Sequence, residues 1–396
     1  MRQQKTGYFN SSTTVRPKAK HVQHQAALER CVAKLRDTMP IVGLRNPKIG
    51  RSDLSWNYCT PYDWVVGFHA GQLWLALQLT GDPVFLNAAR ARRVVFRNIL
   101  VRRDAQDHDL GFQFSLGAVS DWLMTGDSEP RAMALTAASY LLDRFHPEGR
   151  YLQAWNARTI HGGMKSEFAN GRIIADTMQN VALLYWAHKE TGRGDFREAA
   201  DAHSDTSLRY LVRQDDTSFH TFSFDPATGE PQRGATHQGY ADDSCWSRGQ
   251  AWMIHGFAQS ADTTGNGAYL DTSRRLAAKA EQLLGNDKVP VWDYALSGKP
   301  DTPLDSSAAS IMAAGVFLLA SQCEGDEAAR WWAFGDRLLD GLMEVCDLTK
   351  TPDALGLLAH GAAHVKSGYS DNMLPYGDYY YMEALMRSLG HTNFFW

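Results

Sequence analysis

Six glycines that end apolar segments recur along the chain, and this recurrence constrains the fold more than any other feature. A Gly directly after an apolar segment is typical of a helix C-terminus, because it adopts a positive φ without strain. A more amphipathic segment follows each of the first five. The pattern therefore predicts alternating inner and outer helices, with the inner ones ending at Gly81, Gly126, Gly192, Gly265, Gly325 and Gly390.

The segment Trp64–Thr80 illustrates the inner type, since it is apolar on nearly every face and stops at Gly81-Asp82-Pro83. Few segments alternate in the manner of strands. The remaining predicted elements are a first helix over 22–37, a loop over 40–61, a helix over 84–100, and short extended pieces over 219–224 and 289–294.

Six helix pairs can form an open solenoid or a closed ring. Solenoid repeats are uniform and roughly 34 to 47 residues long, whereas the spacing here is uneven and long loops precede the inner helices. We therefore predict an all-α fold, an (α/α)6 barrel, in one catalytic domain over residues 21–396. Residues 1–20 are rich in Lys and Arg and contain no apolar run of signal-peptide length, so they are expected to form an N-terminal arm.

Composition excludes several classes of partner. The net charge is -4 with no long basic run, which argues against nucleic acid and anionic membrane surfaces. No apolar stretch is long enough to span a bilayer. The five cysteines are scattered without a Cys-x-x-Cys pair, so we expect free thiols, no metal site and no cofactor. A cytoplasmic monomer or homodimer, beginning at Met1, is the expectation.

A closed ring of parallel inner helices brings their N-terminal ends to one rim. The polar and aromatic residues near those starts then become neighbours without any metal-binding motif. They are Trp64, His108, Asp109, Phe112, Arg172, Asp176, His237, Gln238, Trp246, Arg248, Asp305, Ser306, Tyr376, Asp378 and Tyr379.

Asp109 and Asp176 are the candidate catalytic carboxylates. Two carboxyl groups at one rim, one of them kept protonated by apolar surroundings, suit general acid and base work on sugars. The alternative is structural: Asp176 would cap a helix, with Gln179 completing a capping box, and Asp109 would be a turn residue.

The stretch from His237 to Trp252 joins a polar loop to an aromatic helix start. A cation in the first turn of a helix opposes the helix dipole, so Arg248 there is expected to face an anion. Trp246 and Trp252 offer flat apolar faces that suit stacking on a sugar. The alternative is a core helix in which Arg248 pairs with Asp242 or Asp243.

Five motifs resemble those of the unsaturated glucuronyl hydrolases of glycoside hydrolase family 88, and the match runs from about Trp64 to the C-terminus. The longest is Gln-Gly-Tyr-x-Asp-Asp-Ser-x-Trp-x-Arg-Gly-Gln-x-Trp within the stretch 237–252. The others are His108-Asp109-Leu110-Gly111-Phe112, Ser218-Phe219-His220-Thr221-Phe222, Asp305-Ser306-Ser307 and Gly377-Asp378-Tyr379-Tyr380-Tyr381-Met382-Glu383-Ala384.

The resemblance implies an (α/α)6 barrel that removes a Δ4,5-unsaturated uronic acid from the non-reducing end of lyase-generated oligosaccharides. By likeness, Asp176 protonates C4 and activates the water that adds at C5, and Asp109 is its partner. The resulting hemiketal opens and releases the sugar without metal or cofactor. The substrate-binding residues expected from this likeness and from the rim are Trp64, His220, His237, Gln238, Trp246, Arg248 and Trp252. Assigning the substrate carboxylate to Arg248 rests on charge.

The chain departs from relatives that favour 6-sulfated fragments. Those carry an Arg directly before the Gln of the Gln-Gly-Tyr motif, where this chain has His237. They also carry a Lys at the end of a Ser-x-x-Ser-x-Lys run, where this chain has Tyr369, with Lys366 three positions earlier. A preference for unsulfated substrates follows, because a buried sulfate needs a fixed cation.

Three other functions fit parts of the pattern. An unsaturated rhamnogalacturonyl hydrolase would apply the same chemistry to pectin fragments. A sugar epimerase on a similar ring would need two rim histidines, and His220 and His237 are available. A non-catalytic ring that binds partners on its surface is disfavoured by the long loops and clustered rim aromatics.

Overall fold

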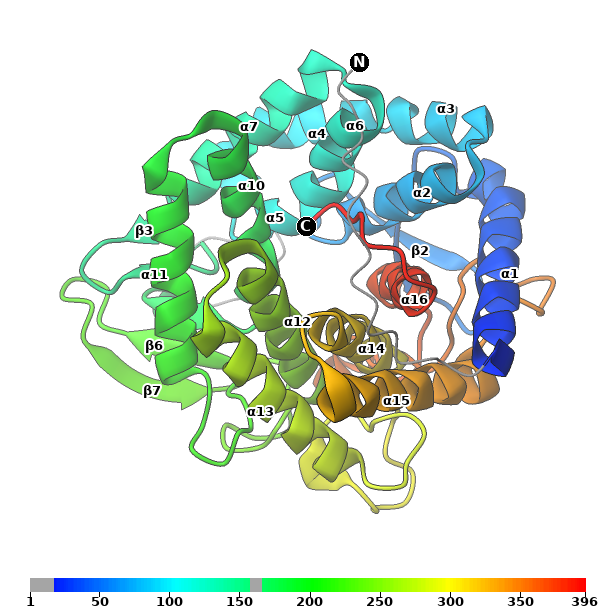
Figure 1. Cartoon of the computed structure of the whole chain (residues 1–396). Coiled ribbons are helices and arrows are strands. Elements are labelled where there is room, and N and C mark those ends of the chain that lie inside the picture. Colours follow the sequence, from blue (N-terminus) through cyan, green and yellow to red (C-terminus); the bar gives the residue numbers. More distant parts are fainter. Residues whose placement is uncertain (1–17, 157–165) are drawn as a thin grey trace.

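The computed structural model describes residues 18–156 and 166–396, and their helices form two concentric rings (Figure 1). The inner ring contains short and long helices separated by turns. In chain order its members are α2 (Val66–Thr80), α5 (Leu110–Phe114) with α6 (Ser120–Thr125), α9 (Thr177–Asn180) with α10 (Ala182–Thr191), α12 (Ser247–Thr264), α14 (Ser306–Ala320) and α16 (Pro375–Ser388).

Contacts between neighbours close the inner ring. Helix α2 packs on α5, α5 on α9, α9 on α12, α12 on α14, α14 on α16, and α16 returns to α2. Every residue of α14 is buried, as expected for a helix with neighbours on all sides. The predicted all-α (α/α)6 barrel is confirmed.

An outer helix covers each inner one and presents a single apolar face. In α15 (Gly325–Gly341), for example, Trp331, Leu338 and Leu339 are buried, whereas Asp326 and Arg330 are exposed. The outer helices are α1 (Lys18–Val42), α3 (Pro83–Ala91), α4 (Arg93–Leu100), α7 (Ser128–Leu142), α11 (Gly194–Tyr210), α13 (Gly267–Leu284) and α15, the last spanning Gly325–Gly341.

Short strands and turns in the loops complete the fold. Strands β1 (Asn46–Gly50) and β2 (Trp56–Cys59) form an antiparallel hairpin. Strand β3 (Phe145–His146) pairs with β4 (Tyr151–Leu152), and β5 (Arg172–Ile174), β6 (Thr221–Phe224) and β7 (Pro231–Ala235) form an antiparallel sheet. The remaining short elements are α8 (Ser166–Ala169), three 3-10 turns (Arg103–Ala105, Tyr294–Leu296, Val365–Ser367) and two π-helical turns (Ser115–Val119, Leu342–Cys346).

The glycine pattern is borne out at the ends of the inner helices except that of α14, which ends at Ala320, whereas Gly325 is the first residue of α15. Gly81, Gly126, Gly192 and Gly265 each follow an inner helix with φ between 67° and 77°, and each donates its amide to the preceding turn. This left-handed conformation is strained for residues with a Cβ.

Several boundaries differ from the prediction. The first helix is α1, which extends past both ends of 22–37 and begins inside the predicted arm; residues 1–17 lie outside the described part. The loop over 40–61 contains the β1–β2 hairpin, and the helix over 84–100 divides into α3 and α4 at Arg92. The extended piece over 219–224 contains β6. The piece over 289–294 makes only isolated bridges, such as Val291 with Leu304.

The five cysteines are all free thiols. Within the described ranges, the helices are too short or too polar to cross a bilayer.

Candidate functional site

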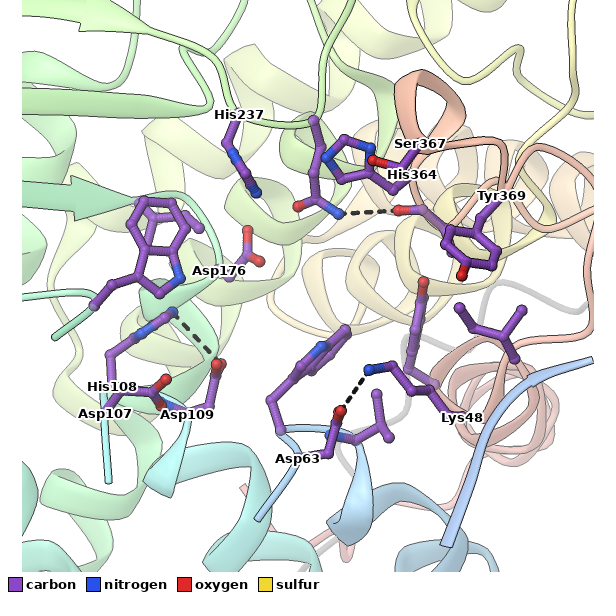
Figure 2. A pocket seen from close by; sticks show the side chains of 18 of the residues that line it. Lys48, Asp63, Asp107, His108, Asp109, Asp176, His237, His364, Ser367 and Tyr369 are labelled. Carbon is purple, nitrogen blue, oxygen red and sulfur yellow. Dashed lines mark hydrogen bonds and ion pairs between the residues drawn. The ribbon is translucent and has the colours of Figure 1, made fainter. Parts of the chain in front are cut away.

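A cavity of about 480 Å³ opens where the inner helices begin (Figure 2). Its walls come from the β1–β2 hairpin, the segments before α2, α5 and α9, and the loops before α12 and α16. The lining residues are Lys48, Ile49, Tyr62, Asp63, Trp64, Val65, Asp107, His108, Asp109, Trp155, Ile174, Asp176, His237, Gln238, Ala363, His364, Ser367, Tyr369 and Tyr376.

Asp176 reaches the cavity because strand pairing and a helix start fix its backbone. Strand β5 pairs with β6, and the amide of Ala175 donates to the carbonyl of His220 at 2.9 Å. Asp176 then precedes α9, but its side chain makes no capping hydrogen bond. Gln179 binds the carbonyl of Trp252 and the hydroxyl of Tyr380 instead of completing a capping box. The structural alternative for Asp176 is therefore excluded.

Burial allows the carboxyl of Asp176 to keep its proton near neutral pH. Loss of solvation raises the pKa of this carboxyl to about 7, and the charge of Arg248 opposes the shift. Among the described residues, its buried Oδ1 has no hydrogen-bond partner. A proton can therefore reside on Asp176 near neutral pH, and the carboxyl is free to engage a ligand.

Asp109 lines the same cavity from the turn before α5. It directly precedes this helix, and the amide of Asp109 donates to Oδ1 of Asp107 at 3.0 Å. Burial raises the pKa of Asp109 well above its usual range, and the charges of Asp107, Asp176 and Asp63 raise it further. Asp109 and Asp176 thus line one cavity, which is where the sequence predicted that the two carboxyl groups would meet.

His108 is neutral and oriented toward Asp109. Burial lowers the pKa of this imidazole to about 4. Its Nδ1 donates to the carbonyl of Ala154 at 2.9 Å, which leaves the Nε2 lone pair 3.5 Å from Oδ1 of Asp109. The His108 ring is therefore held by strand-end backbone and forms a fixed polar wall beside the carboxyl.

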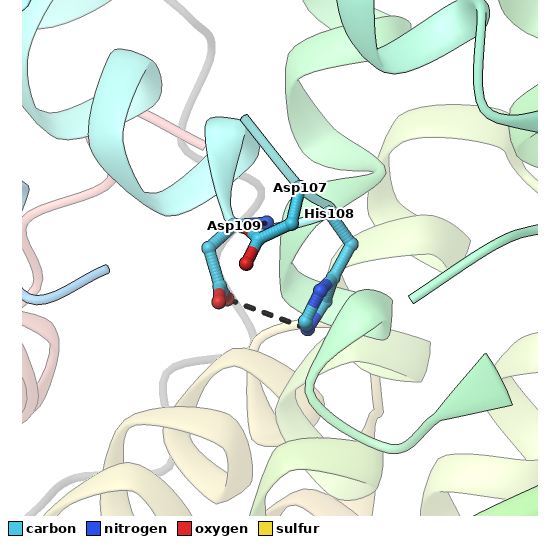
Figure 3. A group of neighbouring side chains, drawn as sticks. All are labelled: Asp107, His108 and Asp109. Atoms are coloured by element: carbon cyan, nitrogen blue, oxygen red, sulfur yellow. Dashed lines mark hydrogen bonds and ion pairs between the residues drawn. The ribbon is translucent and has the colours of Figure 1, made fainter. Parts of the chain in front are cut away.

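Asp107, His108 and Asp109 form the described group whose side chains lie close enough to share a metal ion (Figure 3). Their potential ligand atoms lie within 4.8 Å of one another. Part of this ligand capacity is used within the protein, because Asp107 accepts the Asp109 amide and His108 is bound to Ala154. The group offers three ligands from three consecutive residues.

Arg248 does not line the cavity, which corrects its assignment to the substrate carboxylate. Its side chain is 1% exposed. Its Nη1 donates to Asp305 at 2.5 Å and to the carbonyl of Ala362 at 2.7 Å, and its Nη2 donates to the carbonyl of Ala363 at 2.8 Å. An Arg paired within the protein is the observed arrangement, with Asp305 as partner in place of Asp242 or Asp243.

His220, Trp246 and Trp252 also lie behind the cavity wall. Nδ1 of His220 accepts the backbone amides of His237 and Gln238 at 3.1 and 3.2 Å. The Trp246 ring packs 4.3 Å from the ring of His220. These contacts hold the loop that brings His237 and Gln238 to the cavity, so His220 and Trp246 support side chains that line the cavity and do not line it themselves.

Trp252 is a core residue. Its ring is fully buried and packs 5.2 Å from Phe112 and 5.4 Å from Tyr380. Of the other predicted rim residues, the structure places Trp64, His108 and Tyr376 on the cavity. Those away from it are Phe112, Arg172, Asp305, Ser306, Asp378 and Tyr379.

Sequence reasoning missed lining residues that come from loops. Figure 2 shows Lys48, Asp63 and Tyr369 on one side of the cavity and Asp107, His108 and Asp109 on the other. Lys48 pairs with Asp63 at 2.7 Å. Other lining residues not predicted for the site include Trp155, His364 and Ser367. No local motif marks these residues, because the hairpin and the loop before α16 approach the site only in the folded ring.

Comparisons with known proteins agree on one family. No family model matches the chain. An unsaturated glucuronyl hydrolase of Bacillus sp. (strain GL1) is 39% identical over 344 residues, covering 84% of this chain and 88% of that protein. An unsaturated chondroitin disaccharide hydrolase of Streptococcus pneumoniae is 33% identical over 339 residues, covering 84% of each.

A solved structure shares the whole architecture. The crystal structure of the Bacillus sp. GL1 unsaturated glucuronyl hydrolase, described as responsible for glycosaminoglycan degradation, superimposes with a TM-score of 0.86 at 36% identity. The match covers 92% of this chain and 96% of that one.

The raised pKa of Asp176 predicts a pH-dependent cost to stability. An unfolded Asp titrates near about 3.9, whereas the folded pKa is about 7. Between these values the native state binds more protons, so the free energy of unfolding contributed by this group falls as pH rises. Asp176→Asn should therefore raise the melting temperature most near about pH 8, with the gain fading toward about pH 4. Calorimetry across this range tests it; a gain that grows at low pH would contradict it.

Proposed function

The chain belongs to the unsaturated glucuronyl hydrolases, and on that premise we propose that it removes the Δ4,5-unsaturated uronic acid from the non-reducing end of lyase-generated oligosaccharides. The two curated relatives are named for unsaturated glucuronyl and unsaturated chondroitin substrates. Both names favour fragments of glycosaminoglycans or similar acidic polysaccharides over pectin fragments.

The observation that carries the proposal is the buried pair of carboxyl groups in one cavity. Hydration of an enol ether needs a proton at C4 and a water at C5. Asp176, with a pKa of about 7, holds a proton near neutral pH and is free of protein partners at its buried Oδ1. General acids work best when their pKa lies near the working pH.

The mechanism follows from these positions. Asp176 donates its proton to C4, and an oxocarbenium-like centre develops at C5 and the ring oxygen. A nearby carboxylate stabilises this positive charge. Asp176, now ionised, takes a proton from the water that attacks C5 and is restored. The product is a hemiketal, which opens and releases the linked sugar. Asp109 is the partner carboxyl that shapes the charge around Asp176.

Substrate binding is assigned to the lining residues among those predicted: Trp64, His237 and Gln238. Trp64 packs 4.9 Å from Tyr376 and exposes part of its ring, which suits stacking on a sugar. Gln238 is fixed by a hydrogen bond to the carbonyl of Ala363 at 3.0 Å. His220, Trp246, Arg248 and Trp252 act as supports of these groups.

No metal or cofactor enters the proposed reaction, because the carboxyl groups supply the acid, the base and the compensating charge.

A cytoplasmic location is proposed from the five free thiols, which suit a reducing compartment. Acidic oligosaccharides are the proposed partners, with no nucleic acid or membrane surface, and a monomer or homodimer remains the expected state.

A sugar epimerase would need two histidines in the cavity, one as acid and one as base, and His220 does not fit this role. Nδ1 of His220 is occupied by backbone amides, and its ring lies outside the cavity. The non-catalytic alternative conflicts with the family, whose named members are hydrolases.

The role of Asp176 can be tested against a second buried aspartate. Asp176→Asn should lower turnover by about three orders of magnitude or more, since it removes the proton donor. Asp378→Asn is the matched control: burial raises its pKa to about 7 as well, but it binds the amide of Leu358 and lies outside the cavity. The loss of ultraviolet absorbance of the C4=C5 bond gives the rate. Full activity in Asp176→Asn would contradict the assignment.

Specificity for sulfation is a second test. Burial lowers the pKa of His237 to about 4, so this side chain is neutral at pH 7. Among the described residues, Lys48 is the lysine that lines the cavity, and it is already paired with Asp63. We expect unsulfated unsaturated chondroitin disaccharide to be preferred over its 6-sulfated form by about tenfold in kcat/KM, equal to about 1.4 kcal/mol. His237→Arg should reduce that preference. A wild-type preference for the 6-sulfated form would mean that a cation such as Lys48 or Lys366 reaches the sulfate.

A further inference from the structure

The two carboxyl groups come from separate short segments, and the proposed reaction requires them at a fixed separation. Asp109 precedes α5 and Asp176 precedes α9, and these are the first turns of two separate inner helices that continue into α6 and α10. Their relative position must therefore be set by contacts between the segments.

Asn180, the last residue of α9, makes such contacts with both segments. Its Oδ1 accepts the backbone amide of Phe112, in α5, at 2.6 Å. Its Nδ2 donates to the backbone carbonyl of Asp176 at 3.2 Å. The side chain also lies close enough to the carboxyl of Asp109 to oppose the rise in the pKa of Asp109 caused by burial. One fully buried amide thus binds both catalytic turns.

Gly111 permits this arrangement. A Cβ at Gly111 would lie 2.3 Å from Cα of Asn180 and 2.4 Å from its carbonyl oxygen. The two segments therefore touch through their backbones, and a side chain at Gly111 would push Asp109 away from Asp176. The His-Asp-Leu-Gly-Phe motif thus supplies both a carboxyl and the space for the residue that positions it.

We propose that Asn180 is a positioning residue that locks Asp109 and Asp176 into one geometry. It does not line the cavity, so it acts through the two carboxyl groups and not on the substrate. The inference rests on the proposed function, in which these groups share one reaction. A displacement of about 1 Å at reacting groups can cost about a hundredfold in rate.

Asn180→Asp tests the proposal with little change in shape. The carboxyl keeps an acceptor for the amide of Phe112 but, when ionised, cannot donate to the carbonyl of Asp176. We expect kcat to fall about a hundredfold with KM changed by less than about threefold. Gln179→Glu is the matched control: it makes the same amide-to-acid change at an equally buried neighbour, whose partners are Trp252 and Tyr380.

The readouts are kcat, KM and melting temperature on an unsaturated disaccharide. The proposal requires that Gln179→Glu keep kcat within about threefold of wild type. Unchanged kcat in Asn180→Asp, or equal losses in both variants, would overturn it. If Asn180→Asp does not fold, Asn180→Ser, which removes the amide without adding charge, takes its place with the same expected loss. A wild-type protein that leaves the double bond intact would instead overturn the proposed function, and this inference with it.

Discussion

Burial of the Asp176 carboxyl is the constraint around which the structure is arranged. A carboxyl in water is ionised at neutral pH, whereas the closed helical ring removes solvent and raises the pKa of Asp176 to about 7. The cost of burying an acid without a protein partner is met by packing elsewhere in the ring. The result is a proton held at the floor of a cavity large enough for a sugar.

A second layer of polar contacts holds the cavity wall in place. Arg248 joins the start of α12 to Asp305 at the start of α14 and to the loop at Ala362 and Ala363. His220 holds the backbone of His237 and Gln238. Buried hydrogen-bond networks of this kind rigidify a site. The long motif around Arg248 therefore contributes more to the support of the cavity wall than to the lining of the cavity.

Features that depend on local chemistry could be predicted from the sequence. A glycine with a positive φ that directly follows an apolar segment, such as Gly81, is typical of a helix end, so the helical ring could be inferred. Asp109 and Asp176 precede inner helices, so their meeting at one rim could be inferred as well. The rotation of α12 about its own axis could not be predicted. This rotation decides whether Trp252 faces a bound sugar or the core, and only the packing of α12 against its neighbours sets it. Lys48 lies in strand β1 and Trp155 lies in the segment after β4; both reach the cavity through contacts with distant parts of the chain, so no local sequence pattern predicts them.

The central claim is that the buried acid acts on a double bond and not on the anomeric carbon. The most direct measurement compares an unsaturated glucuronyl disaccharide with its saturated counterpart, following release of the linked sugar and loss of the double bond together. We expect the unsaturated disaccharide to release the linked sugar and to lose the double bond in equal amounts, and the saturated disaccharide to be left intact. Cleavage of the saturated disaccharide at a comparable rate would show attack at the anomeric carbon and would contradict the account.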